Sequence, residues 1–214
     1  METENPSTLT PQQAWDQLIA GNRRFASGTS NHPHLDEARR SQLTGGQNPS
    51  AVIIACSDSR VPVELIFDAG LGDVFVVRTA GPILGESVMG SISFAVNALE
   101  VPLVIVLSHE SCGAVAASVD ALEAGTIPDD HRRVLVERVS PSILMARAEG
   151  KKEVFEFERR HAAEVASQLM QRMPRLRSKL TNGEVGVVAA RYLLEDGIVE
   201  AVAGHGVDVG PELL

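Results

Sequence analysis

Runs of consecutive apolar residues alternate along this chain with stretches in which apolar residues recur every three or four positions. The runs are typical of buried strands, and they occupy residues 51–55, 74–77, 103–107 and 185–190. Helical spacing predicts helices over about 11–26, 36–43, 85–99, 132–148 and 153–173, a further helix that ends at Gly125, and a short helical turn within 61–67. Residues 192–202 resemble a hairpin with Glu195-Asp196-Gly197 as its turn. We therefore predict an α/β fold whose central sheet has four parallel strands plus an antiparallel edge strand, flanked by helices.

The N-terminal segment has its own helix signal. Thr10 followed by Pro11 is typical of an N-cap with proline in the first turn. We predict that residues 1–214 form a single domain in which residues 1–45 are a helical arm. We expect this arm to pack on a partner subunit, with its own domain as the alternative surface.

Composition and charge narrow the class of protein. A length of 214 residues with 44% hydrophobic and 22% charged residues suits one globular domain. The net charge of -9 argues against nucleic acid or an anionic membrane surface as a partner. The longest apolar run, near residues 101–107, is too short to span a bilayer, and residues 1–5 do not resemble a signal peptide. We expect a cytoplasmic protein with reduced thiols.

The first predicted strand runs directly into three chemically active side chains, Cys56, Asp58 and Arg60. In an extended backbone these alternate positions would share one face. Asp58 could be a metal ligand or could accept a hydrogen bond from a metal-bound water, and Arg60 could hold it away from the metal by a bidentate contact. An ordinary salt bridge between Asp58 and Arg60 is the alternative.

A second apolar run is followed by His109 and Cys112, and Cys56 and Cys112 are the only two cysteines of the chain. Ligands in α/β sheets bind beyond the carboxyl ends of the strands, so Cys56, His109 and Cys112 would meet if their strands are neighbours. Two thiolates and an imidazole favour zinc, one ion per chain, with the fourth position open as in catalytic sites. A disulfide or two inert buried thiols are the alternatives.

The remaining polar side chains have simpler explanations. Arg78, at the end of the second strand, could bind an anion or form a salt bridge. We expect the others to be structural, surface or loop residues: Glu110, Tyr192, His32, His34, His131, His161 and His205.

The motifs Cys56-Ser57-Asp58-Ser59-Arg60 and His109-x-x-Cys112-Gly113, with the segment 72–78 between them, resemble the β-class carbonic anhydrases from about Trp15 to Tyr192. The resemblance implies that Cys56, His109 and Cys112 bind zinc and that Asp58 and Arg60 form a catalytic dyad. It also implies that the N–H of Gly113 holds the substrate and that the CO₂ cleft is lined by Phe75, Ala80 and Phe94. Members of the family form homodimers or homotetramers with active sites at the subunit interface.

The implied reaction is the reversible hydration of CO₂ to bicarbonate and a proton by zinc-bound hydroxide. Two alternatives remain: hydrolysis of a CO₂ analogue such as carbon disulfide, and a non-catalytic zinc-binding or redox protein. One subgroup of the family has an inhibitory bicarbonate site that uses a tryptophan where this chain has Ile53, which argues against that regulation. If Asp58 left Arg60 and displaced the water, activity would be low near neutral pH and would rise in alkali.

Overall fold

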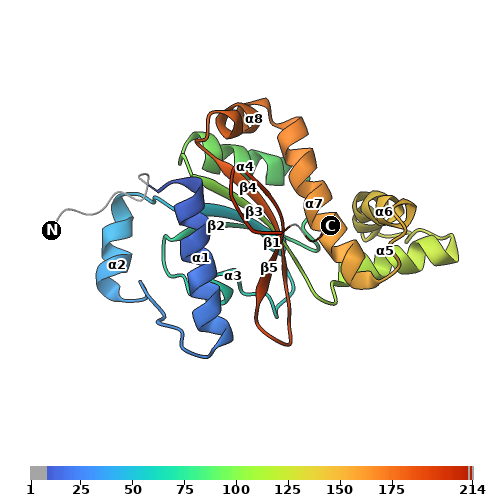
Figure 1. The fold of residues 1–214 in the computed structure, drawn as a ribbon, viewed down its shortest axis with the longest axis horizontal. Coiled ribbons are helices and arrows are strands. Elements are labelled where there is room, and N and C mark those ends of the chain that lie inside the picture. Colours follow the sequence, from blue (N-terminus) through green and yellow to red (C-terminus); the bar gives the residue numbers. More distant parts are fainter. Residues whose placement is uncertain (1–8, 212, 214) are drawn as a thin grey trace.

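The computed structural model describes residues 9–211 and 213, so residues 1–5 and the beginning of the N-terminal arm lie outside the described part. Its centre is a five-stranded sheet in the order β2-β1-β3-β4-β5 (Figure 1). The strands are β1 Ala51–Cys56, β2 Val74–Thr79, β3 Leu103–His109, β4 Gly186–Tyr192 and β5 Val199–His205. The first four are parallel, and β5 runs antiparallel to β4 at the edge. The predicted sheet and its hairpin are confirmed.

The apolar runs are buried because both faces of the sheet are covered. Every residue of β1, β3 and β4 is buried. Val52 and Ile54 belong to the core beneath α4 (Glu86–Asn97) and α7 (Val154–Arg172), whereas Ile53 belongs to the core on the opposite face. A strand buried on both sides loses the alternation of polar and apolar positions.

Eight α-helices surround this sheet in the described residues. Besides α4 and α7 they are α1 Pro11–Ala26, α2 Glu37–Gln42, α3 Val63–Ile66, α5 Gly113–Ala124, α6 Arg133–Ala148 and α8 Pro174–Thr181, and a 3₁₀ turn covers Leu43–Gly45. The sequence pattern does not predict α8, because a proline at position 174 indicates the end of the preceding helix. Proline is favoured in the first turn of a helix, and Pro174 begins α8. No described helix is long and apolar enough to cross a membrane.

The N-terminal arm divides into a packed part and an exposed part. Thr10 caps α1 through a capping box with Gln13, and α1 buries Trp15 and Leu18 in the core on the Ile53 face of its own sheet. Helix α2 has no buried residue and lies at the outer end of the molecule (Figure 1). Packing of the arm on a partner subunit therefore stays a prediction. Within the described part of the arm, α2 is the helix whose surface is available for such a contact.

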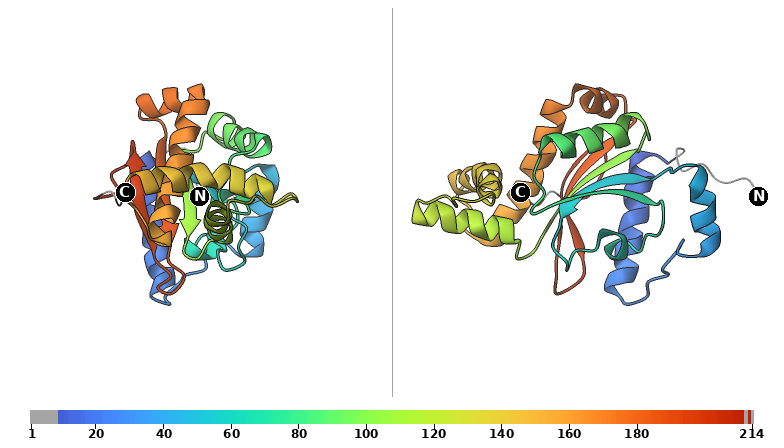
Figure 2. Two further views of the ribbon diagram at one scale, coloured as in Figure 1. Left: turned by 90° about the vertical axis from the view of Figure 1, so that its right-hand side faces the viewer. Right: turned by 180° about the vertical axis from the view of Figure 1, so that it is seen from behind.

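Helices α5 and α6 lie side by side at the end of the molecule opposite α2 (Figure 2). Helix α5 begins at Gly113, and Cys112 is its N-cap. The carboxyl end of β3 therefore connects the sheet to this outer pair of helices through the segment that carries the second ligand motif.

Candidate metal and catalytic site

Neighbouring strands place the three expected metal ligands together. β1 and β3 pair in parallel, with Ala55 opposite Leu107. Cys56 is the last residue of β1, His109 is the last residue of β3, and Cys112 follows after a turn. Their side-chain ligand atoms all lie within 4.8 Å of one another, and all three residues are buried. The sequence-based expectation that they converge is confirmed.

The histidine is oriented for a metal. Its Nδ1 lies 2.8 Å from the carbonyl oxygen of Glu110, which requires a proton on Nδ1. Its Nε2 is buried and has no hydrogen-bond partner among the described residues. A buried imidazole nitrogen without a partner is costly, whereas a metal ligand needs an unprotonated nitrogen whose ring is fixed through the other. The donor set of two sulfurs and this nitrogen therefore fits a zinc ion.

The two thiols of the site differ in acidity. The hydrogen bond from Cys112 is the largest cause that lowers the pKa of the Cys56 thiol, against the effect of burial. The same contact, with burial, raises the pKa of Cys112. Burial alone would lower the pKa of His109, but the neighbouring Cys56 outweighs it and raises that pKa overall. The site thus gathers negative charge at Cys56 and is prepared for a cation.

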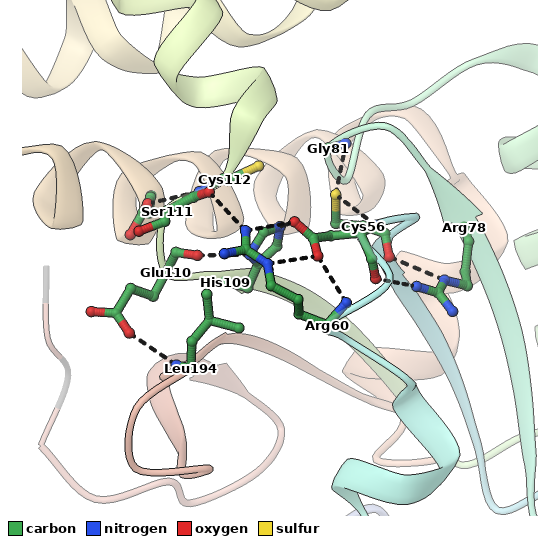
Figure 3. Close-up of polar contacts among 11 residues, drawn as sticks. Cys56, Arg60, Arg78, Gly81, His109, Glu110, Ser111, Cys112 and Leu194 are labelled. Carbon is green, nitrogen blue, oxygen red and sulfur yellow. Dashed lines mark hydrogen bonds and ion pairs between the residues drawn. The ribbon is translucent and has the colours of Figure 1, made fainter.

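Two backbone N–H groups point at the sulfur of Cys56. The N–H of Gly81 lies 3.2 Å from it and that of Asp58 lies 3.4 Å away (Figure 3). Gly81 has φ of 73°, and a Cβ added there would lie 2.7 Å from the Cβ of Ala114. From the sequence, residues 79–82 were only a turn, and the Gly-Pro pair within them was the available signal for this close approach.

The segment from Cys56 to Arg60 differs from the predicted extended strand. Cys56, Asp58 and Arg60 do not share the face of an extended strand, because β1 ends at Cys56. A turn follows, in which the N–H of Arg60 donates to Asp58 Oδ1 at 2.9 Å and the N–H of Val61 donates to the Asp58 carbonyl at 3.0 Å. These local bonds, rather than strand alternation, bring the three side chains to one place.

The expected contact between Asp58 and Arg60 is present and bidentate. Arg60 Nε lies 3.0 Å from Oδ1 and Nη2 lies 2.8 Å from Oδ2. The hydrogen bond from Arg60 holds the pKa of Asp58 well below its usual range, so this side chain is a carboxylate. Asp58 Oδ2 lies 4.0 Å from His109 Nε2, beside the ligand cluster. Figure 3 shows Arg60 between the loop after Cys56 and the segment that carries His109 and Cys112.

Arg78 and Glu110 support the backbone of the site. Arg78 Nε lies 3.0 Å from the carbonyl oxygen of Cys56, and its Nη2 lies 2.7 Å from that of Asp58. Glu110 Oε2 accepts the N–H of Leu194 at 2.9 Å. Arg78 therefore fixes the loop after β1, and Glu110 ties the loop after β3 to the β4–β5 connection (Figure 3).

The residues expected to bind substrate lie in two places. Gly113 directly follows Cys112, and a Cβ there would meet open space. Ala80 is exposed and precedes Gly81, which contacts Cys56. Phe75 lies near the beginning of β2, and its ring centroid is 6.2 Å from that of Phe94, which is 50% exposed on α4.

Within the described residues, the ligand cluster contains no histidine besides His109. His161 is buried, with Nδ1 3.0 Å from Ser142 Oγ. His34 Nδ1 lies 2.8 Å from both carboxylate oxygens of Asp73. The rest are exposed or half-buried: His32, His131 and His205.

Comparison with known proteins gives a consistent family. The family profile described as carbonic anhydrase matches residues 51–199. Carbonic anhydrase 2 of Mycobacterium tuberculosis is 47% identical over 192 residues, which cover 90% of this chain and 92% of that protein. A carbonic anhydrase of Mycolicibacterium smegmatis is 46% identical over 200 residues, covering 94% and 97% of the two chains.

Solved structures share the fold. The β-carbonic anhydrase CcaA has a TM-score of 0.68 and 25% identity, with 88% of this chain and 95% of that chain covered. A tetrameric β-carbonic anhydrase of Sordaria macrospora has a TM-score of 0.66 at 20% identity, with 90% and 99% covered, which is a likeness of fold alone.

Proposed function

This chain belongs to the β-class carbonic anhydrase family and is an enzyme of CO₂ hydration, and we propose that zinc, held by Cys56, His109 and Cys112, is its metal. The observation that carries the proposal is the buried, unpartnered Nε2 of His109 within 4.8 Å of two sulfurs. Three ligands from the chain leave one coordination position for water.

The metal supplies one part of the chemistry. When bound, zinc lowers the pKa of a coordinated water so that a nucleophile forms near neutral pH, as in carbonic anhydrases with three histidine ligands. Cys56, His109 and Cys112, at and just beyond the carboxyl ends of β1 and β3, would hold the ion. The N–H groups of Gly81 and Asp58 stabilise the negative charge of Cys56.

Asp58 and Arg60 control the orientation of the reacting water. The carboxylate of Asp58 is charged and acts as a hydrogen-bond acceptor toward the open position, 4.0 Å from His109 Nε2. The bidentate contact with Arg60 keeps Asp58 there instead of among the ligands. The arrangement in the structure thus favours the role of acceptor over that of a fourth metal ligand.

The substrate groups are assigned by family resemblance and by their positions. The N–H of Gly113, directly behind Cys112, donates to the oxygen atoms of CO₂ or bicarbonate. Ala80 lines the approach next to the Gly81 contact. Family resemblance also assigns Phe75 and Phe94 to the apolar cleft, but their rings pair near the beginning of β2, four register positions from Cys56, so of these four residues only Gly113 and Ala80 lie next to the ligands.

The assembly is a homodimer or homotetramer, and the compartment is the cytoplasm. The exposed helix α2 and the half-exposed ring of Phe94 suit contact with another copy, and one structure of this fold is tetrameric. The reducing cytoplasm keeps the free thiols of Cys56 and Cys112 available for the metal.

The decisive experiment measures CO₂ hydration and zinc content for the wild type and Asp58→Ala. The variant keeps all three ligands, so we expect full zinc content with activity reduced by roughly 10²–10⁴-fold. Asp130→Ala is the matched control, because Asp130 pairs with Arg132 at the same spacing outside the site. Absence of activity from a fully zinc-loaded wild type between pH 7 and 9 would overturn the proposal, and turnover of carbon disulfide instead would identify the alternative substrate.

A further inference from the structure

A buried carboxylate from a distant part of the chain contacts the ligand segment. Glu158 lies on α7 and is only 1% exposed. Its Oε1 accepts the backbone N–H of Cys112 at 3.2 Å. The backbone of Cys112 is the N-cap of α5, so its position decides where the second thiol lies relative to Cys56 and His109.

Glu158 is held in turn by a chain of charges. Its Oε2 accepts from Arg191 Nε at 2.7 Å, and Arg191 on β4 is 5% exposed. Arg191 Nη1 lies 3.2 Å from Glu200 Oε1 on β5. Arg159 completes the chain with two bonds of 2.8 Å to the Glu200 carboxylate. Negative and positive side chains thus alternate along this chain of ion pairs, from Glu158 beside the metal site to the partly exposed Arg159.

Stabilisation of the fold alone does not explain why Glu158 and Arg191 are buried as a charged pair. A buried ion pair is often no more stable than apolar residues of the same volume, because desolvation offsets the attraction. What the pair does provide is a fixed acceptor, since a carboxylate bound by Arg191 cannot move away from Cys112. Partners that orient metal ligands act in this way.

We propose that Glu158 is a positioning residue of the metal centre, which fixes the Cys112 thiolate by holding its backbone N–H. The inference rests on the proposed zinc site, and it adds that this site is completed by α7 through Glu158, whose carboxylate is held by Arg191. Phe157, the neighbour of Glu158, belongs to the same small core as Cys56 and Cys112, so α7 also contributes to the packing around the ligand segment.

Glu158→Gln tests the role of the carboxylate with the smallest change in shape. Two donors, the Cys112 N–H and Arg191 Nε, approach the two oxygens of Glu158. A glutamine has nearly the same volume but only one acceptor oxygen, so it can satisfy one donor and not both. Glu200→Gln is the matched control, because it makes the same chemical change in the same chain of charges without a contact to the ligand segment.

The readout is zinc affinity, measured by competition with a chromophoric chelator on metal-free protein, with the thermal midpoint of the metal-free protein measured alongside. We expect Glu158→Gln to weaken zinc binding by roughly 10–100-fold. Glu200→Gln should lower the midpoint but keep the zinc affinity within about twofold of wild type, because it does not touch Cys112. The Co²⁺-substituted Glu158→Gln protein should also show an altered thiolate-to-metal charge-transfer band.

Two results would overturn the proposal: an unchanged zinc affinity in Glu158→Gln, or equal losses of affinity in both variants that follow their losses of thermal stability. If Glu158→Gln does not fold, Glu158→Asp keeps the charge but withdraws the carboxylate by one methylene, and zinc affinity equal to wild type would count against the proposal. If the wild type binds zinc but does not hydrate CO₂, the proposed function is wrong. The zinc affinities of the two variants would still test the role of Glu158.

Discussion

Arg60 and Asp58 form a two-point contact in which the guanidinium Nε and Nη2 lie 3.0 Å and 2.8 Å from the two carboxylate oxygens. Arg60 Nη2 also lies 3.4 Å from the carbonyl oxygen of Ser111, in the segment between His109 and Cys112. Arg60 therefore connects the loop after β1 to the loop after β3, and it holds the Asp58 carboxylate beside the ligand cluster, 4.0 Å from His109 Nε2.

Arg60→Lys should lower kcat/KM for CO₂ hydration by roughly 100-fold, because a displacement of the Asp58 carboxylate by about 1 Å is expected to have an effect of this size. A lysine ammonium cannot present two parallel donors to a carboxylate. Asp58 is then free to turn toward the metal, while the three ligands are unchanged. Stopped-flow CO₂ hydration with metal analysis of the same samples checks the expected fall in rate at full zinc content.

Arg132→Lys is the control for this prediction. Arg132 Nε contacts both oxygens of Asp130 at 3.0 Å and 2.9 Å, and its backbone N–H donates to the same carboxylate at 2.9 Å, so the local motif is alike. It lies at the beginning of α6, away from the ligands. Equal losses in the two variants would mean that the substitution acts through general stability and not through the site.

Arg78→Gln should reduce kcat/KM by roughly tenfold with zinc content near that of wild type. Arg78 donates to the carbonyl oxygens of Cys56 and Asp58 at 3.0 Å and 2.7 Å, and glutamine is too short to reach both. The loop that carries Asp58 would then sample other positions. Steady-state kinetics check the loss, with Arg177→Gln on the exposed side of α8 as control. Wild-type kinetics in Arg78→Gln would show that the two backbone contacts are not needed.

The ligand set could be predicted because each ligand lies at or just after the end of a strand that the sequence pattern indicates clearly. Cys56 and His109 end apolar runs too uniform to be anything but buried strands, and neighbouring parallel strands place their carboxyl ends together. The pairing of Asp58 with Arg60 could be predicted from spacing, although the turn that produces it could not. Local hydrogen bonds after Cys56 replaced the extended geometry that alternation assumes.

The supporting residues could not be found in the same way. Glu158 reaches Cys112 from 46 positions away in the chain, so no local pattern links them. In the sequence it is one more acid among the charged residues of an amphipathic helix. Gly81 carries only the weak signal of a glycine before proline. Helix α8 was missed because a proline marks the beginning of a helix as well as the end of the preceding one.

Removing the metal should abolish CO₂ hydration and leave the fold intact. The two larger cores lie on the two faces of the sheet and contain none of the ligands. We expect the chelated protein to keep a cooperative thermal transition with a lower midpoint, since a ligand that binds only the folded state stabilises it. Circular dichroism melting with and without chelator checks this, and an unfolded metal-free chain would contradict it.

Zinc affinity should rise with pH. Contact with Cys56 and burial raise the pKa of the Cys112 thiol, so this thiol is protonated in the metal-free protein and zinc must displace the proton. Each displaced proton increases the apparent binding constant by about tenfold per pH unit. Titration calorimetry at pH 6.5, 7.5 and 8.5, in buffers of different ionisation enthalpy, measures both the affinity and the protons released. Affinity independent of pH would contradict this account of the thiol pair.

Acid should destabilise the metal-free protein through His161. Burial lowers the pKa of this imidazole to about 4, partly opposed by the nearby carbonyl of Pro82, whereas a histidine of the unfolded chain titrates near ~6.5. Between these values the unfolded chain binds a proton that the folded chain does not. The free energy of unfolding is therefore fully retained above about pH 6.5 and falls by up to about 1.4 kcal/mol per pH unit toward pH 4.

Urea denaturation in the presence of chelator, at half-unit steps from pH 4.5 to 7.5, tests this dependence. His161→Gln should flatten the curve relative to wild type, because the group that takes up the proton on unfolding is gone. His131→Gln, at an exposed position, should reproduce the wild-type curve. Parallel curves for wild type and His161→Gln would assign the acid sensitivity to other groups, among them His109, which is common to all three proteins.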